Sequence, residues 1–212
     1  MRLILFTSIT ILILIIWKLD IFTYPIKEVT ISSSNSRYNQ DDVYEYLDSI
    51  YGKNLLTLDI DKIKFMIIKD KWIRDAEISK IFPDEIKIII IEHEPLAIYN
   101  DLLMTINGNL IDYSKIDNIP IIRDNTNDQD VSYQILKKVS QKLIKIDLEI
   151  EKIEIFHSLI NIKTQEAILI SDREKIYENI DRLIRSYNKL KDLYDKDIYS
   201  IDMRYSNGFA IK

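Results

Sequence analysis

The sequence predicts an α+β protein with a transmembrane helix at its N-terminus, then a β-α-α-β-β domain, and then an antiparallel β-sheet domain with two helices. Three observations carry this prediction. Residues 3–17 form an apolar run without a charge. Residues 26–92 show the order strand, helix, helix, strand, strand. Later segments alternate between short strand patterns and two long helical patterns. The expected boundaries are 1–24 for an anchor with a minimal cytoplasmic tail, 25–95 for the first domain and 96–212 for the second.

The composition excludes several classes of function. The 212 residues carry a net charge of -5, with lysines and acids interspersed, so no basic face is expected for nucleic acid. Because the chain has no cysteine, thiolate chemistry and cysteine-ligated metals are excluded. The three glycines, Gly52, Gly108 and Gly208, lie too far apart to build a phosphate-binding loop. We therefore expect no cofactor and no small-molecule substrate.

The apolar N-terminal segment is expected to be an uncleaved membrane anchor over residues 3–24. The uncharged run of about 15 residues is short for a bilayer, so a cleaved signal peptide is the alternative. No Ala-x-Ala-like site follows the run, and Trp17 suits the interfacial aromatic belt. The anchor reading places everything after Tyr24 outside the cytoplasm.

The first domain should begin with a strand, since Val29 and Ile31 alternate with polar residues. Asn39 can cap a helix and Asp59 a second one. The expected apolar positions are Val43, Tyr44, Leu47 and Ile50 in the first helix and Ile60, Ile63, Met66 and Ile67 in the second. A hairpin follows, with its turn at residues 82–85 and apolar positions Ala76, Ile78, Ile86, Ile88 and Ile90. Two helices should thus cover one face of a three-stranded sheet.

The triplet Glu92-His93-Glu94 could be a metal or acid-base site, or only the end of a strand. His93 should point to the opposite strand face from the two glutamates, and the only other histidine is His157. Nothing in the sequence would shift the pKa values of the glutamates. We therefore expect a solvated strand end, with Pro95 stopping the strand ladder.

The second domain should open with a hairpin, because Asn107-Gly108 is a strong turn signal between two apolar segments, 103–106 and 110–111. Residues 119–122 are expected to form a short edge strand, and Asp130 to cap a helix. That helix has an apolar stripe of Val131, Ile135, Leu136, Val139, Leu143 and Ile144. Its lysines could bind lipid or an acidic partner, or could form a solvated face: Lys137, Lys138, Lys142 and Lys145.

Three alternating segments at 153–155, 160–162 and 168–170 are typical of an antiparallel meander. Asp172 is then expected to cap a long helix. Its apolar positions are Ile176, Ile180, Leu183, Ile184, Tyr187 and Leu190. Their spacing would suit a coiled coil, but a single helix between strands is expected to pack on its own sheet.

Two stretches resemble a known family. The first stretch comprises Trp72-Ile73, Pro83-Asp84, the strand 86–91 and the ending Glu92-His93-Glu94-Pro95-Leu96-Ala97. The second is Ile201-Asp202-Met203-Arg204-Tyr205-Ser206-Asn207-Gly208. Both are similar to the bacterial cell-division family FtsQ/DivIB, in which a transmembrane anchor precedes a POTRA domain and an FtsQ-type β domain. The chain departs from the family pattern before the long helix, where Leu-Gly is usual, and it carries neither the cytoplasmic nor the C-terminal tail of many members.

The resemblance implies a non-enzymatic scaffold of the divisome, which links early and late cell-division proteins. It implies a single-pass inner-membrane protein enriched at the septum, with periplasmic domains that bind FtsB and FtsL and help control septal peptidoglycan synthesis. The residues carried over as the partner site are Arg204, Tyr205, Asn207, Gly208 and Phe209. An open sheet edge could accept a partner strand there, with an aromatic anchor. The alternative for these residues is a tight turn that only stabilises the terminal hairpin.

Other functions remain to be weighed against the scaffold. A POTRA-containing periplasmic adaptor for secretion or envelope assembly would be followed by a barrel or further repeats. A membrane-anchored hydrolase would need a convergent set of catalytic residues, and no such motif stands in the sequence. A peptidoglycan or small-ligand binder is the third alternative, which binding to FtsB-like proteins or to cell-wall fragments would distinguish.

Overall fold

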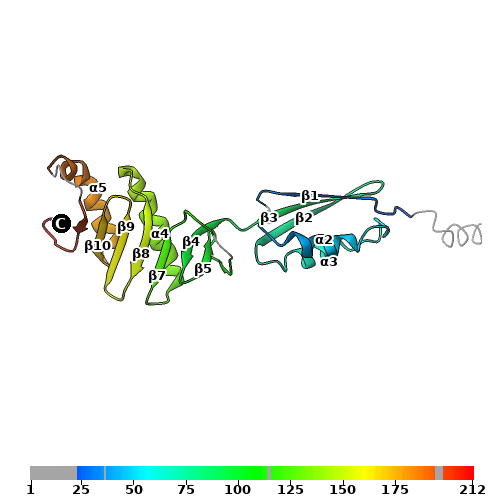
Figure 1. Cartoon of the computed structure of the whole chain (residues 1–212), viewed down its shortest axis with the longest axis horizontal. Coiled ribbons are helices and arrows are strands. Elements are labelled where there is room, and N and C mark those ends of the chain that lie inside the picture. The colour runs from blue at the N-terminus through cyan, green and yellow to red at the C-terminus, as the bar shows by residue number, and fades with distance from the viewer. Residues whose placement is uncertain (1–22, 36, 114–115, 194–197) are drawn as a thin grey trace, which may run out of the picture. The chain divides into compact units, whose positions relative to one another are not determined.

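The computed structural model describes residues 23–35, 37–113, 116–193 and 198–212, and these form two compact units that divide between His93 and Glu94 (Figure 1). We call them unit 1 and unit 2. The predicted anchor lies outside the described residues, except for Thr23 and Tyr24. Among the helices that are described, none is long and apolar enough to cross a bilayer.

Unit 1 has the predicted order of elements: β1 (Glu28–Ser33), α2 (Gln40–Asp48), α3 (Ile60–Ile67), β2 (Ile73–Ile81) and β3 (Glu85–Glu92). The sheet order is β1-β3-β2. The strand β3 pairs antiparallel with β2 through the hairpin and parallel with β1. The two helices lie on one side of this sheet (Figure 1).

The core of unit 1 follows the predicted apolar stripes with three exceptions, since Tyr44, Ile60 and Met66 lie outside its cluster. Val43, Leu47, Ile63 and Ile67 turn inward and meet Ile86, Ile88 and Ile90 of β3 in one buried cluster. Tyr44, however, is exposed, and Tyr46 packs against the core instead. Asp59 caps α3 as predicted, accepting a hydrogen bond from the Lys62 amide at 3.1 Å. Asn39 precedes α2 without capping it, because its side chain makes no hydrogen bond to the helix.

Unit 2 is a nine-stranded sheet with two α-helices and one turn of 3-10 helix. Its elements are β4 (Pro95–Tyr99), β5 (Leu102–Thr105), β6 (Leu110–Ile111), β7 (Ile121–Asp124), α4 (Gln129–Leu143), η1 (Ile144–Ile146), β8 (Ile150–Ile155), β9 (Leu159–Thr164), β10 (Ile168–Asp172), α5 (Ile176–Leu193), β11 (Ser200–Asp202) and β12 (Ala210–Ile211). The sheet order is β12-β11-β10-β9-β8-β7-β4-β5-β6. The hairpin at Asn107-Gly108 and the meander β8-β9-β10 are confirmed.

The prediction of an antiparallel sheet is wrong in part, because the sheet is mixed. The pairs β4-β7, β7-β8 and β10-β11 are parallel. Parallel neighbours need a crossover, and α4 and α5 supply it between β7 and β8 and between β10 and β11. The segment 119–122 was expected at an edge, yet β7 lies inside the sheet between β4 and β8. Pro95 does not end a ladder but begins β4.

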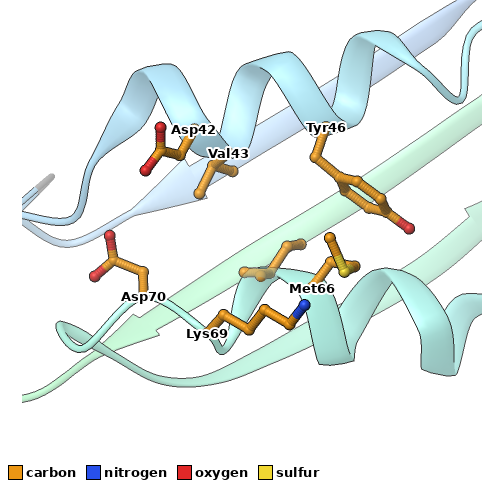
Figure 2. A pocket seen from close by; sticks show the side chains of 7 residues that line it. Asp42, Val43, Tyr46, Met66, Lys69 and Asp70 are labelled. Atoms are coloured by element: carbon orange, nitrogen blue, oxygen red, sulfur yellow. The ribbon is translucent and has the colours of Figure 1, made fainter.

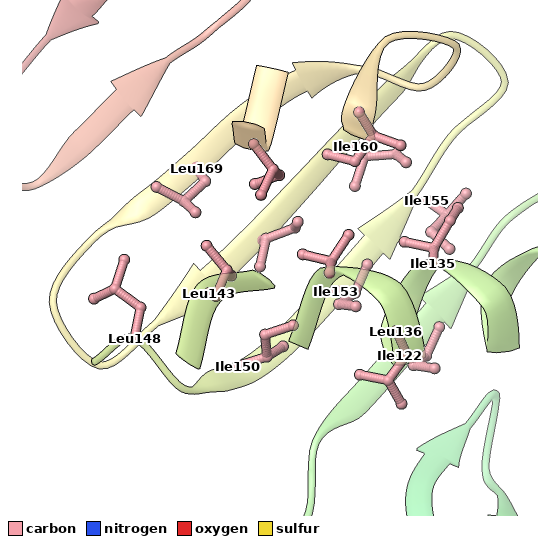
Figure 3. Packing of buried hydrophobic residues seen from close by; sticks show 14 of the residues in the cluster. Ile122, Ile135, Leu136, Leu143, Leu148, Ile150, Ile153, Ile155, Ile160 and Leu169 are labelled. Carbon is pink, nitrogen blue, oxygen red and sulfur yellow. The ribbon is translucent and has the colours of Figure 1, made fainter. Parts of the chain in front are cut away.

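The core of unit 2 lies between the sheet and its helices. Figure 3 shows Ile135, Leu136 and Leu143 of α4 in one cluster with Ile153 and Ile160 of the meander. The predicted inward positions of α5 are also confirmed, with Ile176, Ile180, Leu183 and Tyr187 buried and Ile184 and Leu190 partly buried against the same cluster. The long helix therefore packs on its own sheet.

Three details of the helices differ from the prediction. The cap of α4 is Asp128, whose side chain accepts a hydrogen bond from Val131 N at 3.1 Å, so the predicted cap Asp130 already lies in the helix. Asp172 belongs to β10, and α5 begins at Ile176. Val131 and Ile144, predicted for the stripe of α4, are exposed: Val131 lies in the first turn of α4, and Ile144 lies in η1, after α4 has ended at Leu143.

Candidate functional site

The strand β12 forms one edge of the nine-stranded sheet. It pairs antiparallel with β11 alone among the described strands. Ser200 and Lys212 exchange two backbone hydrogen bonds of 3.0 Å, so the N–H and C=O of Lys212 point toward β11. Alternate residues of a strand direct these groups to opposite sides, so the N–H and C=O of Ile211 point to the open edge. This edge can accept a further strand.

The segment between β11 and β12, residues 203–209, contains all five predicted site residues. Arg204 is half exposed and paired with Asp202, from its Nη2 to Oδ2 at 2.6 Å and from its Nε to Oδ1 at 2.9 Å. Hydrogen bonding from Arg204 holds the pKa of Asp202 below its usual value, against the opposing effect of burial. The two hydrogen bonds to Asp202 therefore orient the Arg204 guanidinium, although its side chain stays half exposed.

The other four predicted residues divide into exposed and packed positions. Tyr205 is 58% exposed, which is high for an aromatic side chain, and Asn207, two residues later, is also exposed. Gly208 has no atom within 4 Å of the place where a Cβ would lie, so a backbone could approach there. Phe209 instead packs against the core of unit 2. The structure thus brings all five into one segment, with Tyr205 outward and Phe209 inward.

Arg182 of α5 holds this segment, and the sequence analysis did not single it out. Its Nη1 donates to the Ser206 carbonyl at 3.0 Å, and its Nη2 donates to the Met203 carbonyl. The guanidinium also lies over the Phe209 ring, with 5.1 Å between Cζ and the ring centroid. The only signal in the sequence was an arginine between apolar positions of a helix, which is too common to identify a partner 20 or more residues away.

Tyr199 is a second residue that the sequence analysis missed. It is 66% exposed, and its amide donates to the Lys212 carbonyl at 2.8 Å, beside the end of β12. Exposed tyrosines therefore stand before and after β11, the strand next to the edge strand β12.

The triplet Glu92-His93-Glu94 is not a solvated strand end throughout, so that prediction is wrong for Glu92. The Glu92 carboxylate is buried and accepts hydrogen bonds from the Asn35 amide at 3.1 Å, from the Arg37 amide at 2.9 Å and from the Ser33 hydroxyl. Glu94 is exposed. Burial, with Arg74 nearby, lowers the pKa of His93. Glu92 is thus a structural carboxylate that fixes the chain between β1 and α2.

A pocket of about 240 Å³ opens between α2 and α3 of unit 1. Figure 2 shows Asp42, Val43 and Tyr46 on one side and Met66 and Lys69 on the other. The carboxylate of Asp70 at its end is occupied by the amides of Asn39 and Trp72, both at 2.8 Å. Within the described parts of the chain, no three histidine, aspartate or glutamate side chains gather in a way that could hold a metal ion.

Comparison with known proteins finds matches to one family. The model of the FtsQ-type POTRA domain matches residues 24–93, which cover unit 1. The chain is 23% identical to the cell division protein FtsQ of Nitrosospira multiformis, over 96% of this chain and 89% of that protein. It is 24% identical to FtsQ of Cellvibrio japonicus, over 89% of this chain and 60% of that protein. It is 27% identical to FtsQ of Bartonella bacilliformis, over 84% of this chain and 60% of that protein.

Proposed function

Because this chain belongs to the FtsQ/DivIB family of bacterial cell-division proteins, we propose that it acts in division as a non-enzymatic scaffold. Residues 25–95 and 96–212 are its two extracytoplasmic domains in this proposal, and residues 3–24 hold it in the inner membrane as a single span. It gathers at the septum with other divisome proteins and contributes to the control of septal peptidoglycan synthesis.

The partner in this proposal is the FtsB and FtsL pair, bound at the open edge of unit 2. The observation that supports it best is the edge strand β12, whose Ile211 backbone groups have no strand to pair with among the described residues. A partner segment would add a strand there by main-chain hydrogen bonds. Tyr205 would be the aromatic anchor, and Arg204, Asn207 and Gly208 would line the approach, while Phe209 would support the segment from below.

The sharpest test is a proline at position 211. Ile211→Pro removes one N–H from the open edge and leaves the hydrogen bonds between Ser200 and Lys212 in place. Loss of one strand hydrogen bond is worth about 1 kcal/mol, so affinity for the extracytoplasmic part of the FtsB and FtsL pair should fall about fivefold. The full-length protein in nanodiscs can be measured by biolayer interferometry. Ile211→Val, which keeps the N–H, is the matched control and should bind like the wild type.

A second variant tests the aromatic anchor. Tyr205→Ala should weaken the same binding while circular dichroism and the melting temperature stay unchanged, because the side chain is exposed. Unchanged affinity in both Ile211→Pro and Tyr205→Ala would show that the edge is not the partner site, and the segment 203–209 would then be only a turn.

A further inference from the structure

Exposed apolar side chains lie at one end of unit 1, the end where Tyr24 enters it from the predicted anchor segment. The turn of the β2-β3 hairpin lies at this end (Figure 1). Ile81 is 38% exposed and Phe82 54% exposed at this turn, and Leu56 of the loop before α3 is 48% exposed. We call Leu56, Ile81 and Phe82 the apolar tip.

Contacts to Tyr24 bring the apolar tip to the place where the chain enters unit 1. The rings of Tyr24 and Phe82 meet edge to face, with their centroids 5.6 Å apart. The Leu55 amide donates to the Tyr24 carbonyl at 2.8 Å, which brings the loop of Leu56 to the same residue. The loop and the hairpin are therefore fixed beside Tyr24, although they follow it in the sequence by about 30 and about 60 residues, respectively.

Three lysines, together with the acidic Asp84 of the hairpin turn, lie near the apolar tip. Lys27 is exposed at 70% of its side chain, although it pairs with Asp84 at 3.0 Å. Lys53 is exposed, and Lys80 donates to the carbonyls of Leu56 and Leu58 at 3.2 and 2.7 Å. Exposed aromatic and aliphatic side chains with lysines nearby are typical of a surface that contacts the interface of a bilayer containing anionic lipid.

We propose that the apolar tip of unit 1 rests in the lipid headgroup layer and so fixes this domain against the membrane surface. The occupant is the bilayer because the residues before Tyr24 include the apolar run from Leu3 to Trp17. Anchoring of that run would hold Tyr24 at the interface, and Phe82 is in ring contact with Tyr24. The inference rests on the membrane anchor of the proposed function, but it adds a second, independent membrane contact.

Spin labels attached to introduced cysteines can measure how deep chosen residues lie in the bilayer. The chain has no cysteine of its own, so each label reports one position. Three single-cysteine variants of the full-length protein are labelled in vesicles of phosphatidylethanolamine and phosphatidylglycerol. Phe82→Cys reports the apolar tip and Leu12→Cys reports the predicted anchor. Ile68→Cys is the matched control, because Ile68 is as exposed as Ile81 but lies near the start of β2, at the other end of the hairpin. Frequent collisions of a label with oxygen, which concentrates in the bilayer, show that the label lies in lipid. Frequent collisions with a water-soluble nickel chelate show that it lies in water.

The expected result is a several-fold higher ratio of oxygen to nickel collisions at position 82 than at position 68, with the highest ratio at position 12. A water-like ratio at position 82, with a lipid-like ratio at position 12, would overturn the inference and leave the anchor standing. A label at position 82 that neither reagent reaches would also overturn it, because protein would then cover the tip. A water-like ratio at position 12 would refute the anchor itself. Ile81→Cys serves as the second reporter if Phe82→Cys alters the circular dichroism.

Discussion

At the scale of single residues, two buried carboxylates organise the loops that follow strands. Glu92 ends β3 and gathers the amides of Asn35 and Arg37. Asp124 ends β7, where Oδ1 accepts from the Thr126 amide at 2.7 Å and Oδ2 accepts from the Asp128 amide at 2.9 Å and the Ser132 hydroxyl at 2.8 Å. Several hydrogen bonds stabilise a buried carboxylate in its charged form. The loss of one hydrogen-bond partner leaves a buried polar atom unsatisfied, which lowers the stability of the fold.

The adjacent glutamates of unit 1 provide a matched pair of variants. Glu92→Gln should lower the free energy of unfolding of unit 1 by about 1–3 kcal/mol, since the amide group can accept fewer of the loop hydrogen bonds. Glu94→Gln, two residues later and exposed, should change it by less than about 0.5 kcal/mol. Urea unfolding measures both. Equal effects would mean that the contacts of Glu92 do not matter for stability.

Asp124 should make unit 2 sensitive to acid. Burial raises the pKa of Asp124, but hydrogen bonds from Thr126, Ser132 and Tyr99 outweigh burial and hold it below the usual 3.8. A carboxyl whose folded pKa is depressed stabilises the fold above its unfolded pKa, and that stability is lost as the pH falls through the folded pKa.

Asp124→Asn should therefore lower stability at pH 7 by about 2–4 kcal/mol and should flatten the loss of stability below about pH 4. Thermal unfolding across that pH range measures both effects. Asp101→Asn, at a side chain that is 79% exposed, is the control and should keep the wild-type pH profile. The idea fails if Asp124→Asn and the wild type lose stability in parallel as the pH falls.

At the scale of elements, the connection between β11 and β12 depends on one residue of α5. Arg182 donates to two carbonyls of the connection, and a planar guanidinium can reach both at once, whereas an ammonium is a single point. Arg182→Lys should therefore speed amide hydrogen exchange in residues 203–209 and leave the rest of α5 unchanged. Arg185→Lys, an exposed arginine on the same helix, should have no such effect. Equal protection in both variants would refute the role of Arg182.

The sequence predicted most elements of the fold because each rests on local chemistry. The hairpin at Asn107-Gly108, the cap at Asp59 and the alternating strands of the meander all depend on neighbours in the chain. The strand β4 escaped prediction, although Asn100 and Asp101 both adopt positive φ in the turn that joins it to β5. These residue types tolerate that conformation, so the dipeptide was a usable signal.

The rest depended on contacts that are distant in the sequence. Nothing in residues 119–122 says that β7 will be enclosed by parallel neighbours, because β8 comes after a whole helix. The burial of Glu92 likewise depends on the loop after β1, which precedes it by more than 50 residues. The candidate site was predicted from the family resemblance, whereas its supporting residue Arg182 and the exposed Tyr199 were found only in the structure.

At the scale of the whole molecule, each unit has a hydrophobic core of its own. The cluster of unit 1 draws on residues from Ile26 to Ile90, and that of unit 2 on residues from Ala97 to Met203. Ile88→Ala should cost unit 1 about 2–5 kcal/mol, because it opens a cavity at a fully buried position. Hydrogen exchange should then rise in residues 23–93 and stay unchanged in unit 2. A rise of the same size in both units would contradict the independence of the two cores.

The strand β12 contains only two residues, Ala210 and Ile211, and this brevity has a consequence for selectivity. A long open edge could pair with almost any extended chain, including misfolded proteins and other copies of the same protein. An edge of two residues offers too few main-chain hydrogen bonds to hold an unrelated chain. Only a chain whose side chains also fit the exposed Tyr199 and Tyr205 should therefore stay bound.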